Sequence, residues 1–135
     1  LLAEKNLRPD QFFRQIIFTY GHRNVVRAVA SGLAQSGSVD GYVWEVMSSI
    51  EPELTEKTEI VAKSELLGFP PVACLKSKRL SDGVSLLHQA LVEMASDDEG
   101  RHVLDMLKLD GFSDEPEQLF DTIAVKMALV RALGT

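Results

Sequence analysis

The sequence predicts an α/β fold, and two observations support this. In the first half, short apolar runs rich in β-branched residues alternate with segments of helical periodicity. Such alternation is typical of βαβ units in a parallel or mixed sheet. From about residue 81 the chain keeps only helical periodicity. The predicted class is therefore α/β with a mostly helical C-terminal part.

The predicted elements follow one another from residue 15. Four short apolar runs bounded by Gly, Pro or polar residues predict strands, over residues 15–20, 39–43, 59–64 and 72–76. Five segments with apolar residues three and four positions apart predict helices, over residues 22–34, 44–50, 81–94, 101–109 and 116–133. The "GFPP" stretch predicts a turn, because neither Gly68 nor two successive prolines suit a helix or a central strand.

Length, composition and charge limit the classes of protein to which this chain can belong. The chain has 135 residues, of which 45% are hydrophobic, and a net charge of −6. This length fits one compact domain or a piece of a larger one, and the start "LLAEKN", helix-like and without Met, favours a fragment. The acidic balance argues against nucleic acid as a partner, because phosphate binding needs clustered Lys and Arg. No signal peptide and no apolar run of membrane-spanning length is visible.

The stretch "TYGHRNVVRAV" is the first candidate binding site. Gly21 ends a predicted strand, and His22 follows at the start of a predicted helix. A helix N-terminus attracts anions, and ligands of open α/β sheets bind beyond the carboxyl ends of strands. Thr19 and Tyr20 add donors beside His22. The same residues also fit an ordinary turn in which His22 merely begins the helix.

The second candidate is "DGYVWE", which stands at the end of the next predicted strand, so its side chains can face the same crevice. Tyr42 and Trp44 can wall a small pocket there, with Glu45 beside them. The alternative is that both rings are core aromatics and that Asp40 is a local cap. From the residues alone both interpretations stand.

No residue pattern indicates catalysis or a cofactor. The three histidines, His22, His88 and His102, lack metal-ligand spacing. Ser81 and Ser85 lack the context of a nucleophile elbow. The single cysteine, Cys74, lies in an apolar run without a histidine near it in sequence, and it excludes an internal disulfide. We therefore expect a non-enzymatic protein without metal or cofactor.

Taken in order, three stretches resemble a known family. They are "FFRQIIFTYGHRNVVRAVASG", "SVDGYVWEVM" and "TEIVAKSELLGFPPVA". Together they are similar to the phosphonate-, phosphite- and phosphate-binding proteins of ABC importers, the PhnD-like type 2 periplasmic binding proteins. The resemblance covers nearly the whole chain and implies a two-lobed α/β fold in which the ligand is held by cleft closure.

The resemblance implies a division of the chain and a set of ligand residues. Residues 1–67 correspond to part of the second lobe, 68–74 to the hinge crossing, and 75–135 to the helical return to the first lobe, so the chain would be a C-terminal half. His22 matches the family histidine that donates to the anion, with Thr19 and Tyr20 as flanking candidates. Tyr42 and Trp44 would shape the pocket.

Two departures from the family pattern bear on the ligand. Family members that hold a ligand amine use two carboxylates. One of these positions falls on Met47, two residues from Glu45, and prolines of "FPP" replace the other. The resemblance therefore favours a small or amine-free oxyanion: phosphite, phosphate or methylphosphonate.

The resemblance also implies partners and a compartment. A permease would receive the ligand, in the periplasm or outside the cell. The alternative is the sensory ectodomain of a bacterial signalling receptor with the same fold, coupled to a signalling domain. Half of a two-lobed protein would expose strand edges, so we also expect self-association.

Overall fold

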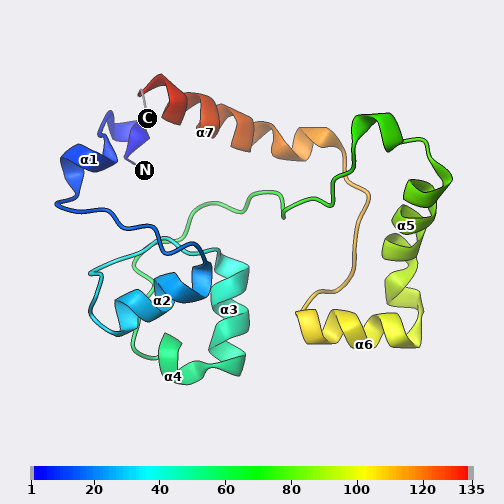
Figure 1. Ribbon diagram of the computed structural model, residues 1–135, viewed down its shortest axis with the longest axis horizontal. Helices are drawn as coiled ribbons and strands as arrows, with labels where there is room; N and C mark the ends of the chain where they lie inside the picture. Colours follow the sequence, from blue (N-terminus) through cyan, green and yellow to red (C-terminus); the bar gives the residue numbers. More distant parts are fainter. Residues whose placement is uncertain (1, 134–135) are drawn as a thin grey trace. The chain divides into compact units, whose positions relative to one another are not determined.

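The computed structural model describes residues 2–133 as helices joined by long non-helical connections (Figure 1). Its elements are η1 (Ala3–Lys5), α1 (Pro9–Phe12), α2 (His22–Ala30), α3 (Gly41–Ile50), α4 (Pro52–Thr55), η2 (Lys76–Lys78), α5 (Asp82–Glu93), η3 (Met94–Ser96), α6 (Asp98–Leu107), η4 (Glu117–Phe120) and α7 (Asp121–Ala132). The chain divides into two compact units. The first runs to Glu65 and includes the stretch from Lys126, and the second is Leu66–Val125.

All five predicted helices are confirmed, with shifted ends. The first helix stops at Ala30 rather than at residue 34, because Gly32 adopts a left-handed φ of 76° and the Ala34 N–H turns back to the Ala28 carbonyl. The fourth begins at Asp98, where the Asp97 side chain accepts a hydrogen bond from the Gly100 N–H.

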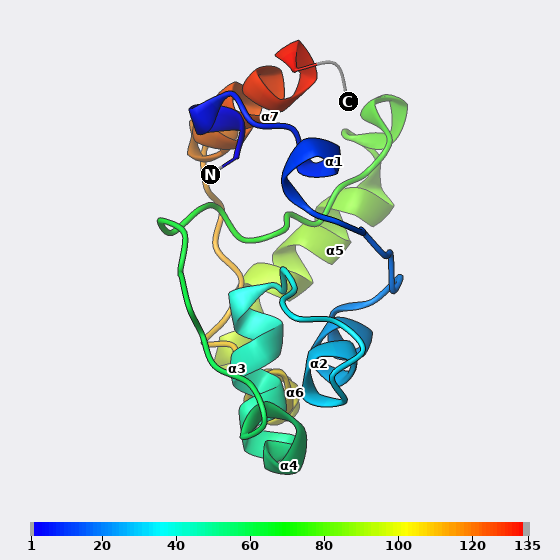
Figure 2. The same ribbon diagram turned by 90° about the vertical axis from the view of Figure 1, so that its left-hand side faces the viewer.

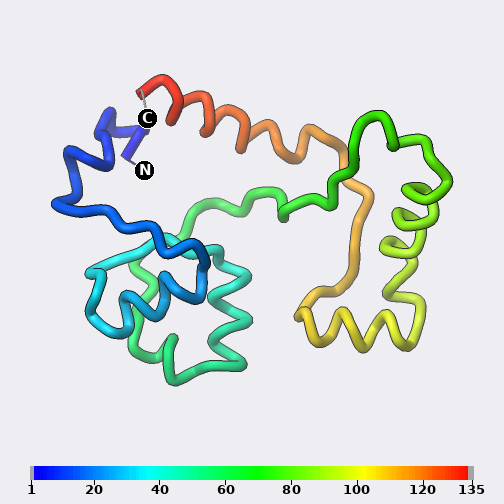
Figure 3. Tube along the Cα trace, in the orientation of Figure 1, coloured from blue at the N-terminus to red at the C-terminus, as the bar shows by residue number. Residues whose placement is uncertain are grey.

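The predicted strands are absent from residues 2–133, so the described part of the chain does not display the α/β class. The prediction of a strand at residues 39–43 is wrong, because Asp40 caps α3 and the following residues form the first turn of that helix. Residues 15–20, 59–64 and 72–75 run through non-helical connections (Figure 3). A strand needs a hydrogen-bonded neighbour, and none of the described segments pairs with these runs.

The core of the first unit is small and lies among α2, α3 and α4. These helices lie together in Figures 1 and 2, and each contacts the other two. Val26 and Ala28 of α2, Met47 of α3 and Thr55 of α4 are its buried residues. Full burial of a side chain such as that of Met47 contributes about 1.5–3 kcal/mol.

An ion pair and a close contact fix the course of the chain around this core. Arg23 near the start of α2 makes a two-pronged salt bridge with Glu51, between α3 and α4. The hydrogen bond from Arg23 is the main reason that the pKa of Glu51 is lowered. Gly37 lies so near α2 that a Cβ there would be 2.3 Å from Cγ1 of Val25. The loop after α2 is therefore pressed against that helix.

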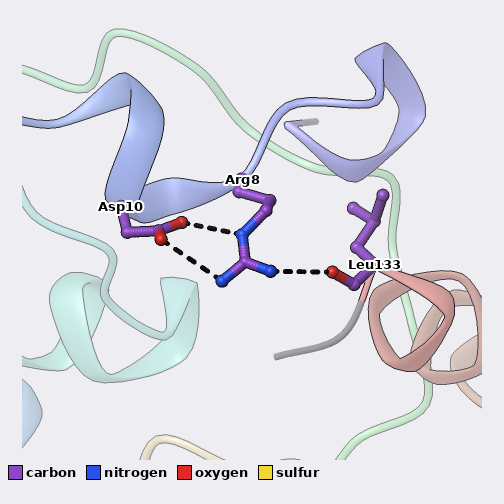
Figure 4. A network of polar contacts seen from close by, with 3 residues as sticks. All are labelled: Arg8, Asp10 and Leu133. Carbon is purple, nitrogen blue, oxygen red and sulfur yellow. Dashed lines mark hydrogen bonds and ion pairs between the residues drawn. The ribbon is translucent and has the colours of Figure 1, made fainter.

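The N-terminal segment and the last part of α7 meet within the first unit. Arg8 pairs with Asp10 through bonds of 3.0 and 3.2 Å and donates to the Leu133 carbonyl at 3.3 Å (Figure 4). Lys126 of α7 lies 2.8 Å from a carboxylate oxygen of Glu65 and 3.6 Å from one of Glu4. These contacts attach the end of α7 to the N-terminal segment.

The second unit has a similarly small core. Leu104 and Gly100 of α6 are buried, and α6 packs against η3, which also contacts α5. A Cβ on Gly100 would lie 2.1 Å from the Met94 carbonyl oxygen. Within the described residues, no helix is both long and apolar enough to cross a membrane.

The non-helical connections expose apolar side chains. Phe18 is 80% exposed, Val61 86% and Leu66 100%. Short runs of apolar residues are typical of buried strands. These segments therefore have the sequence of a strand but lack the neighbouring strands that would cover it.

Candidate anion site at the start of α2

The start of α2 carries free backbone donors. Gly21 is its N-cap and has no side chain to accept from the first turn. The first turn therefore keeps N–H groups that a ligand can satisfy, and the helix dipole adds positive potential there. By contrast, the Asp40 side chain already accepts from the Val43 N–H at the start of α3, at 3.2 Å.

His22 is the first residue of α2 and is exposed. Its Nδ1 accepts a hydrogen bond of 3.2 Å from the backbone N–H of Asp40. A neutral imidazole accepts at one nitrogen and donates at the other. The contact with Asp40 therefore assigns the proton of the neutral ring to Nε2, which leaves His22 a donor for a ligand.

The residues before His22 form a tight turn. The Thr19 hydroxyl donates to the Gly21 carbonyl at 3.2 Å, and the Asn24 side chain donates to the Thr19 carbonyl at 2.9 Å. Tyr20 has a φ of 56° and is 97% exposed. This left-handed conformation costs a bulky residue roughly 1 kcal/mol or more and is typical of functional turns.

The helical start of α3 separates two residues that a strand would have placed together. Tyr42 and Trp44 are two positions apart, which in a helix is about 200° around the axis. Tyr42 and Glu45 are about 60° apart and share a face. The Trp44 indole points to Thr58, with Nε1 3.4 Å from its hydroxyl oxygen, and Glu45 lies 3.8 Å from Lys63.

Sequence reasoning placed His22 at the start of a helix but missed what holds it. The backbone of Asp40 orients the ring, and the side chain of Asn24 ties α2 to the preceding turn. The signal for the helical start was present: Asp40 precedes apolar residues at helical spacing, Val43, Met47 and Ile50.

One cavity of the second unit resembles a catalytic set only in composition. Ser85, His88 and Asp114 line a space of about 370 Å³. His88 Nε2 lies 3.6 Å from Asp114, and no hydrogen bond joins Ser85 to His88 in the described part of the chain. A nucleophile needs its base within hydrogen-bond reach. Residues 2–133 also contain no group of three side chains placed to hold a metal ion.

Comparison with models of protein families gives a match that covers most of the chain. The family model described as "ABC transporter, phosphonate, periplasmic substrate-binding protein" matches residues 1–118. No match was found among curated proteins.

Proposed function

Because the chain belongs to the family of phosphonate-binding periplasmic substrate-binding proteins of ABC transporters, we propose that it binds a phosphorus oxyanion at the start of α2. Members of this family are non-catalytic and periplasmic, and they bind a small-molecule ligand for a permease. The match to a transporter family favours the import role over that of a sensory ectodomain.

The observation that carries the proposal is the hydrogen bonding of the His22 ring. Its Nδ1 is engaged by the Asp40 N–H, so Nε2–H is available beside the uncapped backbone donors of α2. An oxyanion accepts several hydrogen bonds and gains from the helix dipole. Thr19 and Tyr20, in the turn before His22, are the next contacts that we propose.

The arrangement of α3 supports a ligand without an amino group, as in PhnD-like binding of phosphite, phosphate or methylphosphonate. Met47, at the position of one amine-binding carboxylate of the family, is 3% exposed in the core. Glu45 faces Lys63, which offsets its charge. We propose that Tyr42 and Glu45 line one side of the ligand and that Trp44 supports α3 from the other.

We also propose the two-lobed arrangement for the parent fold. Residues 1–67 would belong to one lobe, 68–74 to the hinge crossing and 75–135 to the return. The division between units at Glu65 and Leu66 lies close to this boundary, although the stretch from Lys126 groups with the first unit. The compartment would be the periplasm or the cell exterior.

Calorimetric titration of the purified protein with phosphite, phosphate and methylphosphonate tests the assignment. A hydrogen bond to a charged group contributes about 1.5–3 kcal/mol, so His22→Ala should weaken binding about tenfold or more. His102→Ala is the matched control, because His102 is an exposed histidine of α6 in the other unit. Equal affinity in the His22→Ala variant and the unchanged protein would overturn the assignment.

The exposed apolar connections support a further proposal, that this 135-residue chain self-associates. Phe18 and Val61 lie in strand-like sequence without a neighbouring strand, and a second copy can supply one. Sedimentation velocity over a range of concentrations should show a dimer or larger species. A single monomer boundary at high concentration would contradict the proposal.

A further inference from the structure

A second cavity lies beside α2, on the face away from His22. Its volume is about 480 Å³, and Asn24, Arg27, Ala28 and Ser31 of α2 and its C-cap contribute to its wall. With 100° per residue, these positions lie roughly 140–240° around the helix from His22. His22 does not line this cavity, although Thr19, which precedes the helix, does.

The polar part of this cavity is basic. Arg27 reaches it from α2 and Lys57 from the segment after α4, and no carboxylate is among the residues lining it. Thr19, Asn24 and Ser31 direct their hydrogen-bond donors to backbone carbonyls. The two cations therefore supply the principal charged donors of the cavity.

In the described part of the chain, Arg27 and Lys57 have no carboxylate partner, unlike four other cations of the same unit. Carboxylates lie within 4 Å of Arg8, Arg23, Lys63 and Lys126. Neither Arg27 nor Lys57 has such a partner within residues 2–133. Arg27 does act electrostatically on Glu51, whose pKa is lowered first by Arg23 and to a smaller extent by Arg27. Lys5 and Arg14 also lack a carboxylate partner within residues 2–133, so the feature specific to Arg27 and Lys57 is that both line one cavity.

The remaining wall is apolar. Ala28, which is 6% exposed, Leu33 and Leu54 are among the residues of this wall. Small-molecule sites are typically lined by apolar side chains together with a few charged groups, and this open cavity has both. Its chemistry fits a ligand with an anionic head and a short aliphatic chain.

We propose that this cavity is a second site for a small organic oxyanion, next to the candidate site at His22 and sharing Thr19 with it. Arg27 and Lys57 bind the head group, and Leu33 and Leu54 contact the aliphatic part. The head is a carboxylate or a phosphonate, which share the oxygen acceptors that both cations recognise. The proposal does not depend on binding at His22.

Methyl NMR of the whole protein tests the proposal with butyrate, butylphosphonate and, as a control of opposite charge, butylammonium. The methyl resonances of Leu33 and Leu54 should shift in a saturable way with one or both anions, and butylammonium should leave them in place. The two anions separate the carboxylate from the phosphonate head group. Absence of saturable shifts with both anions in the millimolar range would overturn the proposal.

Two double variants make the test specific. Arg27→Gln with Lys57→Gln should weaken binding at least tenfold, because it removes both charge-assisted bonds. Lys5→Gln with Arg14→Gln removes the same charge from exposed residues that do not line the cavity, and it should retain binding. An equal loss in both variants would mean general attraction of anions and would contradict a built site.

The His22→Ala variant separates this proposal from the function proposed above. It should retain the shifts of Leu33 and Leu54 even where phosphonate affinity falls. Loss of these shifts in His22→Ala would contradict a second site. Circular dichroism of every variant checks that the helices remain folded.

Discussion

Replacement of Gly37 by alanine should destabilise the first unit and disturb the candidate site together. The added Cβ would lie 2.3 Å from Cγ1 of Val25 and 3.5 Å from Cγ2 of Val29. Carbon atoms in contact are separated by about 3.5–4.0 Å, so the first distance requires a shift of more than about 1 Å. The χ1 angle of a helical valine is strongly restricted, so Val25 cannot simply rotate away.

The expected cost of Gly37→Ala is about 1–3 kcal/mol, the range for overpacking. Urea unfolding followed by the fluorescence of Trp44, the only tryptophan and part of α3, measures it. The matched control is Gly41→Ala, because nothing lies within 4 Å of a Cβ at this first residue of α3. Alanine there should leave the free energy of unfolding unchanged or raise it by up to about 1 kcal/mol.

A Val25→Ala variant tests whether the clash with Val25 causes the destabilisation. In a Val25→Ala protein the clashing methyl group is gone, so Gly37→Ala should cost less than it does in the unchanged protein. The NMR signal of the Asp40 amide should also move in Gly37→Ala, because the loop from Gly37 leads to the hydrogen bond with His22. Equal midpoints for Gly37→Ala and Gly41→Ala would refute the reasoning from the close approach.

Two further predictions concern other parts of the chain. Gly100→Ala should destabilise the second unit by about 1–3 kcal/mol or more, because its Cβ would meet the Met94 backbone. Gly83→Ala is the control, because a Cβ there meets nothing within 4 Å. Hydrogen exchange of the α6 amides measures the stability of the two variants. The hydrogen bond from Arg8 lowers the pKa of Asp10, so their pair should persist at the pH of about 4 where free Asp titrates, and its stabilising effect should be lost as pH falls through the lowered pKa. An NMR titration in which Arg8→Gln leaves the pKa of Asp10 unchanged would contradict this.

Helices could be predicted from the sequence because helix signals are local. Apolar spacing and an N-cap such as Asp97 lie within one or two turns, and each predicted helix is present. Strands depend on a neighbour that the local sequence does not specify. The run 15–20 has the composition of a buried strand, yet the described chain offers it no hydrogen-bonded partner.

The candidate site was predicted in part for the same reason. The position of His22 after Gly21 is a local pattern, and it indicated a helix start. The hydrogen bond from the Asp40 N–H joins residues 18 positions apart and depends on the path of the loop between them. The wrong prediction of a strand at residues 39–43 also gave wrong directions for the side chains of Tyr42 and Trp44. Side chains point the same way every two residues in a strand but about every 3.6 residues in a helix.

The hydrogen bond between the Asp40 N–H and His22 connects the imidazole ring at the start of α2 to the residue that caps α3. Nδ1 can accept from the Asp40 N–H only while it carries no proton. A ligand that binds the singly protonated ring through Nε2 leaves the loop attached to α2. A second proton on the imidazole would occupy Nδ1, which could then no longer accept from the Asp40 N–H. The protonation of the ring would then decide whether this hydrogen bond between α2 and the loop before α3 is kept, while the packing of α2 against α3 remains.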